Sequence, residues 1–258
     1  MDNSYDQIIP KVGLGTYNMD SRESEFMTYE AIKYGYRHID TAAVYKNEDG
    51  VSRALERIFN ETQLKREEIF ITTKLWPGGL IKLDRVRDYK DTLKSFEKSL
   101  MRLNLEFVDL YLIHSPHGKS KRIEQWKSLM NLKESGKVKY IGVSNWGINH
   151  INELKENNLP LPDANQIEIH PWSQKPELVK YLRENDIDII AYSSLVPLSS
   201  WRHKDGENSK KTDQMYKIGE SENSPFRLLA QKYNCTEAQF LLQWLSLIHI
   251  SEPTRPLY

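Results

Sequence analysis

Four residues able to exchange protons or carry charge stand at or just after the ends of apolar segments. Asp40 lies in H-I-D-T-A, and Tyr45 follows that segment closely. Lys74 ends the segment I-T-T-K, and His114 ends V-D-L-Y-L-I-H. If these segments are neighbouring parallel strands, their carboxyl ends deliver an acid, a phenol, an ammonium and an imidazole to one place. Such a group could give a proton to a carbonyl oxygen while a hydride reaches the carbonyl carbon.

Each of the four residue types suits a distinct part of that reaction. A phenol has an unperturbed pKa of about 10 and is a reluctant acid, so we expect Lys74 to lower the pKa of Tyr45. Burial would neutralise Lys74, and we expect Asp40 to oppose this by keeping the ammonium charged. His114 could donate a hydrogen bond to the oxygen on which charge develops.

The segments between these residues alternate between strand and helix patterns. The strands are expected at 37–42, 69–74, 108–114, 140–144, 164–169 and 187–192. Amphipathic helices are expected at 50–59, 90–103, 123–134, 148–157 and 176–185, after a first helix that ends at Gly35. Residues 8–15, which include Pro10 and two glycines, are expected to form a short hairpin. Six β/α units with short connections predict parallel strands joined by helical crossovers.

Two architectures fit this alternation, a (β/α)8 barrel of the TIM type and a doubly wound sheet. A doubly wound sheet needs a G-x-G-x-x-G turn after its first strand. The G-L-G-T at Gly13 precedes the first expected strand and opens no helix, so we predict the barrel. The length of 258 residues fits one such barrel of about 250 residues.

Composition excludes several other classes of protein. Lys+Arg and Asp+Glu both number 36, so no net charge favours nucleic-acid binding. No apolar run reaches the roughly 18 residues of a membrane span, and the amino terminus has no signal-peptide pattern. Cys235 is the only cysteine, so no intrachain disulfide is expected and the cytoplasm is the expected location.

Taken together, seven segments resemble the aldo-keto reductase family, and they run in the order of that family from residue 10 to about residue 245. They are G-L-G-T-Y at Gly13, G-Y-R-H-I-D-T-A-A-V-Y-K-N-E at Gly35, I-T-T-K-L-W at Ile71, D-L-Y-L-I-H-S-P at Asp109, Y-I-G-V-S-N at Tyr140, N-Q-I-E-I-H-P at Asn165 and A-Y-S-S-L at Ala191.

The resemblance implies a role for each matching residue. Tyr45 resembles the general acid, Lys74 and Asp40 its tuning pair, and His114 the residue that orients the carbonyl. The remaining residues are implied to bind cofactor or to line the substrate mouth. Ser144, Asn145 and Gln166 would hold the nicotinamide carboxamide, Tyr192 would stack on the ring, Gly15, Thr16 and Ser193 would lie along the cofactor, and Tyr17 and Trp76 would line the mouth.

Every one of these residues also has a structural interpretation. His114 could be a core histidine, Asp40 and Lys74 a structural ion pair, and the two tyrosines Tyr45 and Tyr192 packing residues. Ser144 and Asn145 could cap a helix, and Gln166 could fill a layer of the barrel. These interpretations require many coincidences at strand ends, in order. For a metal site the structural interpretation prevails, because no carboxylate or cysteine cluster accompanies His114 and His117.

One part of the chain departs from the regular alternation, and another departs from the family. A polar stretch from Ser194 to Pro225 is long for a connection, and it is either a flap over the strand ends or an exposed insertion. After the Q-W-L at Gln243 the family has further strands and the residues that grip the adenosine phosphate, which have no counterpart here. We therefore expect a partial barrel domain at 1–245, with strands seven and eight missing or replaced, and a non-native tail at 246–258.

The resemblance implies NAD(P)H-dependent reduction of an aldehyde or ketone to an alcohol. NADP(H) is the expected cofactor and NAD(H) the alternative. A small carbonyl compound is the expected partner, with no nucleic acid and no membrane, and the protein is expected to be a monomer or a weak oligomer. Two other functions stay open: a cofactor-binding, redox-sensing subunit of the same fold, and an inactive truncated fragment.

Overall fold

The computed structural model describes residues 9–81, 83–198, 210–247 and 252–254. Within these ranges eight strands form one sheet, in the order β7-β6-β5-β4-β3-β2-β1-β8, and all the pairings are parallel. The strands are β1 (Val12–Gly15), β2 (His38–Asp40), β3 (Phe70–Leu75), β4 (Val108–Ile113), β5 (Val138–Ser144), β6 (Ala164–Glu168), β7 (Asp188–Tyr192) and β8 (Glu252–Thr254).

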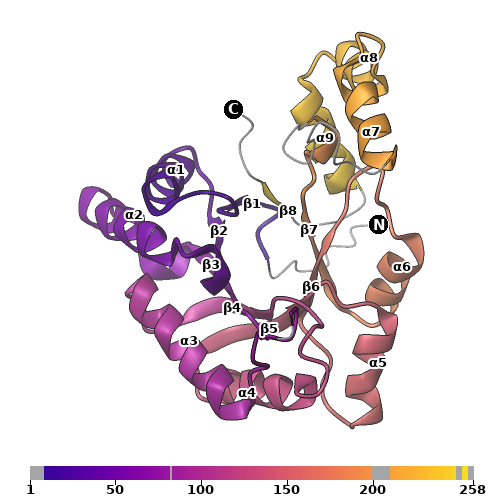
Figure 1. Ribbon diagram of the computed structural model, residues 1–258. Coiled ribbons are helices and arrows are strands. Elements are labelled where there is room, and N and C mark those ends of the chain that lie inside the picture. Colours follow the sequence, from indigo (N-terminus) through magenta and orange to yellow (C-terminus); the bar gives the residue numbers. More distant parts are fainter. Residues whose placement is uncertain (1–8, 82, 199–209, 248–251, 255–258) are drawn as a thin grey trace, which may run out of the picture.

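Helices surround the strands and complete the barrel architecture (Figure 1). They are α1 (Ser21–Lys33), α2 (Glu48–Glu61), α3 (Tyr89–Leu103), α4 (Arg122–Glu134), α5 (Ile148–Glu156), α6 (Pro176–Glu184), α7 (Lys210–Glu220), α8 (Pro225–Lys232) and α9 (Glu237–Leu247). Since β7 also lies close to β8, the sheet curls into a nearly closed barrel. The predicted (β/α) barrel is thereby confirmed. In the described ranges no helix combines the length and hydropathy of a bilayer span.

The segment expected to form a hairpin is instead the first strand of the sheet. Leu14 pairs with Ile39 and Gly15 with Asp40, both in parallel register, while Ile8 lies outside the described residues. The glycines that suggested a turn serve close packing, because a Cβ on Gly13 would lie 2.7 Å from Nδ1 of the His38 ring. Among the described residues, seven strands therefore precede residue 245, where the sequence predicts six.

The eighth position of the sheet is filled by β8. This strand lies parallel to β1, with Val12 opposite Glu252 and Leu14 opposite Thr254. Strands seven and eight were expected to be missing or replaced. The eighth position is filled by Glu252–Thr254, a segment that was expected to be a non-native tail. Leu247 ends α9, and residues 248–251 lie outside the described residues.

Part of the polar stretch after β7 is helical. A 3-10 turn, η3 (Val196–Leu198), follows the strand, and α7 and the start of α8 come later. Residues 199–209 lie outside the described residues. In Figure 1 α7, α8 and α9 gather beside the end of the barrel where β7 ends.

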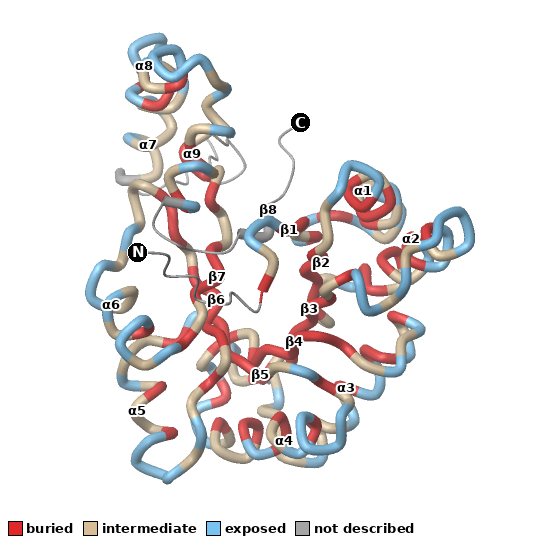
Figure 2. Tube along the Cα trace, turned by 180° about the vertical axis from the view of Figure 1, so that it is seen from behind, coloured by how far each residue is buried: buried red, intermediate tan, exposed pale blue. Residues whose placement is uncertain are grey.

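Burial follows the two layers of a barrel, with the buried positions concentrated on the strands and on the helix faces that touch them (Figure 2). The larger core lies between sheet and helices and takes in the predicted stripe of α2: Val51, Ala54, Leu55 and Ile58. Phe70 and Tyr140 pack against a smaller cluster, which consists of Ile9, Leu110, Leu112, Ala164 and Ile190. Residues of one strand thus alternate between two apolar environments, as β4 does with Leu110 and Tyr111.

Capping residues fix both ends of α1, and so the point at which β2 can begin. Asp20 caps α1 by accepting from the backbone N–H groups of Arg22 and Glu23, and the Glu23 side chain bonds back to Asp20. Gly35 follows α1 with a φ of 95°, which confirms the predicted glycine stop. These caps set where β2 starts, and with it the position of Asp40.

His38, on β2, is a fully buried titratable group that is not one of the four acid–base residues. Its Nε2 lies 2.9 Å from Oγ1 of Thr72, and its Nδ1 is buried without a hydrogen-bond partner in the described part of the chain. Burial lowers the pKa of His38 from 6.5 to about 4, because an imidazolium there would lose its hydration.

Acid should therefore destabilise the fold through His38. The unfolded chain takes up the proton as pH falls below 6.5, while the folded chain does so only near pH 4, so stability is lost across that window. Between pH 7 and pH 5 we expect a loss of about 2 kcal/mol from this residue. Urea unfolding at pH 7 and at pH 5 measures this loss in the free energy of unfolding. The loss between the two pH values should be about 2 kcal/mol smaller in His38→Asn than in the parent protein. An equal loss in both proteins would contradict the assignment.

Candidate active site

The ends of β2, β3 and β4 bring the four predicted acid–base residues together. These strands are parallel neighbours, with Asp40 opposite Thr72 and Lys74 opposite Leu112. Tyr45 stands in the 3-10 turn η1 (Ala43–Tyr45) that follows β2, and His114 directly follows β4. The Tyr45 and His114 ring centroids are 5.5 Å apart at 80°, and Lys74 Nζ lies 5.1 Å from the centre of the Tyr45 ring.

A buried ion pair lies at the base of this group. Lys74 is fully buried, and its Nζ donates to Oδ1 of Asp40 and, at 2.9 Å, to the carbonyl oxygen of Thr41. Burial lowers the pKa of Lys74 because an ammonium loses hydration there, and the carboxylate of Asp40 opposes that change. The part predicted for Asp40, holding charge on the lysine, agrees with this geometry.

The pKa of Tyr45 differs from the prediction. Burial is the main cause that raises it well above its ordinary value of 10, and the charge of Asp40 adds to the effect. The predicted lowering by Lys74 is wrong for this structure because the ammonium is already compensated by Asp40 and lies over the tyrosine ring. The phenol of Tyr45 consequently keeps its proton at neutral pH.

His114 is a neutral imidazole. Burial, followed by the nearby charge of Lys74, lowers the pKa of His114 to about 3. Its Nδ1 is buried and has no hydrogen-bond partner among the described residues. Trp76 packs edge-on against the ring, with centroids 5.9 Å apart. A neutral imidazole can donate one N–H hydrogen bond without bringing a second positive charge beside Lys74.

A second group of polar side chains lies at the ends of β5, β6 and β7. Ser144 Oγ donates to the carbonyl oxygen of Gln166 at 2.9 Å and accepts from Asn145 Nδ2 at 3.1 Å. Asn145 Nδ2 also donates to the carbonyl oxygen of His114 at 3.2 Å, and Tyr192 donates its hydroxyl proton to Asn145 Oδ1 at 2.6 Å. Ser144, Asn145, Gln166 and Tyr192 are thus neighbours, as predicted.

Asp40 joins the two groups, which the sequence did not predict. One carboxylate oxygen binds Lys74, and the other accepts from Gln166 Nε2 at 2.8 Å. Asp40 and Gln166 are 126 residues apart, so no local pattern could reveal this bond. The side chain expected to bind a cofactor amide is therefore coupled to the acid–base residues.

The remaining predicted cofactor residues border the same end of the barrel. Gly15 ends β1, and the backbone N–H of Thr16 donates to the carbonyl oxygen of Asp40 at 2.9 Å. Ser193 follows Tyr192 at the end of β7 in a left-handed conformation, with a φ of 59°. Amide and hydroxyl groups beside a half-buried tyrosine ring suit a flat ring that carries a carboxamide, so the residues present fit a nicotinamide.

Aromatic side chains border the acid–base residues on the outer side. Tyr17 is 50% exposed, and its ring centroid is 5.1 Å from that of Tyr45. Trp76 is held by a hydrogen bond from its Nε1 to Asp84 Oδ2 at 2.8 Å. His117, which was not predicted to belong to the site, lies with its ring centroid 6.5 Å from that of Trp76. A rim of exposed and partly buried aromatic side chains can contact a substrate.

Glu48 is a buried charge that sequence reasoning passed over. It lies in the first turn of α2, where Oε1 accepts from Thr73 Oγ1 at 2.6 Å and Oε2 accepts from Arg102 Nε at 2.6 Å. Thr73 immediately precedes Lys74 in β3, so Glu48 ties the segment after Tyr45 to that strand. A charged residue at the start of an amphipathic helix gives no sequence signal for such a contact.

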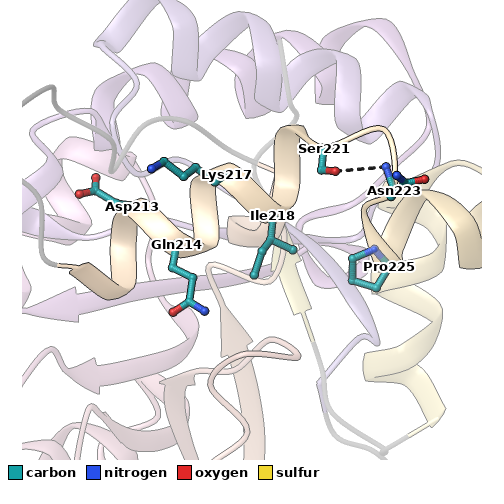
Figure 3. Close-up of a pocket in the computed structure, with 7 residues that line it drawn as sticks. All are labelled: Asp213, Gln214, Lys217, Ile218, Ser221, Asn223 and Pro225. Carbon is teal, nitrogen blue, oxygen red and sulfur yellow. Dashed lines mark hydrogen bonds between the residues drawn. The ribbon is translucent and has the colours of Figure 1, made fainter.

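A separate cavity of about 830 Å³ lies on α7 and the turn into α8 (Figure 3). It is lined by Asp213, Gln214, Lys217, Ile218, Ser221, Asn223 and Pro225. None of the predicted site residues lines it.

Comparison with known proteins decides the family. The model of the aldo/keto reductase family matches residues 11–247. The chain belongs to this family. The seven segments that suggested the resemblance thus reflect true membership, and this aldo/keto reductase is an oxidoreductase.

Relatives of this aldo/keto reductase include two bacterial enzymes. The chain is 37% identical to the glyoxal reductase of Bacillus subtilis over 92% of its own length and 74% of that protein. It is 37% identical to the methylglyoxal reductase DkgA of Yersinia pestis, over 92% and 75%. Among solved structures, the Bombyx mori aldo-keto reductase in complex with NADP matches with a TM-score of 0.79 at 30% identity, covering 96% of this chain and 79% of that one.

Removing one member of the ion pair should harm this reductase more than removing both. Asp40→Ala leaves the buried ammonium of Lys74 uncompensated and should reduce the free energy of unfolding by about 3–5 kcal/mol. The double variant with Lys74→Met removes the charge as well and should recover most of that loss. Urea unfolding at pH 7 measures both. A double variant no more stable than Asp40→Ala would show that charge compensation is not the reason for the pair.

Proposed function

We propose that this aldo/keto reductase reduces a small aldehyde or ketone to the alcohol with NADPH, and that Tyr45 is the general acid. The observation that carries the proposal is the phenol of Tyr45 packed between a buried lysine and a neutral histidine, Lys74 and His114. Family membership supports the reaction type.

NADP(H) is the proposed cofactor, in line with the NADP complex of the Bombyx mori relative. When bound, its nicotinamide supplies the hydride. Ser144, Asn145 and Gln166 would hold the carboxamide, and Tyr192 would lie against the ring. Gly15, Thr16 and Ser193 would lie along the rest of the cofactor. These side chains fix which face of the ring is turned toward the substrate.

The protein's own residues then complete the reduction. The neutral His114 donates a hydrogen bond to the carbonyl oxygen and keeps it near Tyr45. As the carbonyl carbon gains a hydride, Tyr45 transfers its proton to the oxygen and becomes a phenolate. An alkoxide is a stronger base than a phenolate, so a phenol with a raised pKa can still protonate it. Lys74 then stabilises the phenolate that remains.

The names of the relatives suggest the first substrates to test. Glyoxal and methylglyoxal, named in the two bacterial relatives, are small carbonyl compounds. We propose compounds of this class as substrates here, with the exposed Tyr17 and the partly buried Trp76 at the mouth of the site.

Tyr45→Phe tests the role of the general acid. Loss of the phenolic proton should lower kcat for methylglyoxal by roughly 10²–10⁴-fold. The Kd for NADPH, measured by fluorescence quenching, should change less than about threefold because the phenol holds no part of the cofactor. Undiminished turnover in the variant would remove Tyr45 from the mechanism. NADPH binding without turnover in the parent protein would instead favour the redox-sensing alternative.

The pH dependence of kcat tests the state of the two proton-bearing groups. The pKa of His114 is lowered to about 3, so the imidazole stays neutral above that pH. The pKa of Tyr45 is raised above 10, so the phenol stays protonated below that value. We expect kcat with saturating NADPH and methylglyoxal to be flat from pH 5 to pH 8. A step with a midpoint near 6.5 that disappears in His114→Gln would contradict this.

A further inference from the structure

Asn47 is a fully buried amide that takes no direct part in the chemistry described above. Its Nδ2 donates to the carbonyl oxygens of Thr16 at 2.8 Å and Met19 at 3.0 Å. Its Oδ1 accepts from Thr41 Oγ1 at 2.9 Å and Thr16 Oγ1 at 3.3 Å. Both amide hydrogens and the amide oxygen of Asn47 therefore form hydrogen bonds. A smaller side chain could not make these bonds.

The partners of Asn47 are neighbours of the acid–base residues. The loop from Thr16 to Met19 carries Tyr17, whose ring packs on Tyr45. The carbonyl oxygen of Thr41 accepts from Lys74 Nζ at 2.9 Å. The amide of Asn47 thus connects the segments that hold the phenol, the ammonium and the outer aromatic ring.

The backbone around Asn47 explains why such a connection is needed. Lys46, between Tyr45 and Asn47, has a φ of 59°, a left-handed conformation that a lysine adopts only when its surroundings enforce it. The carbonyl oxygen of Asn47 accepts from Ser24 Oγ at 2.9 Å and from the N–H of Gly50 at 3.1 Å, so the residue also begins α2. The two residues that follow Tyr45 in the chain are thereby held in place, and they restrict the position of Tyr45.

We propose that Asn47 is a positioning residue that sets the place of the Tyr45 hydroxyl relative to Lys74 and His114, a role that rests on the function proposed for Tyr45. Removing the amide frees two backbone carbonyls and lets Lys46 leave its left-handed conformation. Tyr45 then moves relative to Lys74, and the proton transfer slows while the cofactor residues of β5, β6 and β7 stay in place.

The test compares Asn47→Ala with Thr41→Val, a nearly isosteric change that removes one of the four hydrogen bonds. The readout is the single-turnover rate constant for oxidation of bound NADPH by methylglyoxal, which does not depend on the folded fraction. We expect about a 30-fold decrease for Asn47→Ala, since small misplacements of reacting groups can cost up to about 10²-fold, and about fivefold for Thr41→Val. The Kd for NADPH should change less than about threefold for Thr41→Val, which leaves the bonds between Asn47 and Thr16 in place.

Two combined variants separate positioning from general destabilisation. Because Thr41 acts through Asn47, the double variant Thr41→Val/Asn47→Ala should be no slower than Asn47→Ala alone. In a Tyr45→Phe background, Asn47→Ala should produce no further loss. Effects that multiply in either pair, or a rate constant for Asn47→Ala within twofold of the parent, would overturn the proposal.

Trp126→Phe is the matched control. It removes a partly buried hydrogen bond of 3.0 Å from Trp126 Nε1 to the carbonyl oxygen of Pro160, near the amino end of β6 and so opposite the site. This variant should lower Tm and leave the single-turnover rate constant unchanged. If Asn47→Ala does not fold, Thr41→Val decides alone, and a parental rate constant there overturns the proposal. Full activity of Tyr45→Phe would refute the proposed function itself, which distinguishes that failure from this one.

Discussion

The buried pair between Lys74 and Asp40 is the interaction on which the rest of the site depends. A full positive charge inside a barrel is tolerated only if a counter-charge and hydrogen bonds replace its lost water. Asp40 supplies the counter-charge, and its second oxygen binds Gln166, while the carbonyl of Thr41 takes another ammonium proton. The pair therefore joins β2, β3 and β6. Misplacing β2 or β3 would leave a charge uncompensated, and misplacing β6 would remove the hydrogen bond from Gln166 to Asp40.

The same burial sets the protonation of the neighbours. It lowers the pKa of His114 to about 3 and raises that of Tyr45, so both groups are neutral around the charged pair. With Lys74 compensated by Asp40, the phenol is not ionised in advance of the reaction. Stabilisation of a phenolate then matters only once the proton has left, which is the condition for favouring a transition state over the ground state.

The sequence predicts the barrel and the meeting of the four acid–base residues because both follow from a regular alternation of parallel strands and helices. The sequence does not predict features that depend on contacts between residues far apart in the chain. The sequence predicts a hairpin at 8–15 rather than the strand Val12–Gly15, because the packing of His38 on Gly13 cannot be read from either segment alone. The bond between Asp40 and Gln166 and the raised pKa of Tyr45 likewise depend on the assembled barrel.

Backbone conformation at the strand ends links the fold to the chemistry. Non-glycine residues with a positive φ include Lys46 at 59°, Asn145 at 63° and Ser193 at 59°, and the last two are predicted site residues themselves. These three residues directly follow Tyr45, Ser144 and Tyr192, where the chain leaves or has just left the sheet and must turn sharply toward the next helix. Such conformations are unfavourable for residues with a Cβ, and packing elsewhere must offset their cost. The large apolar core between sheet and helices provides that stability, so the rigidity of the outer layer allows the strained turns that aim the polar side chains.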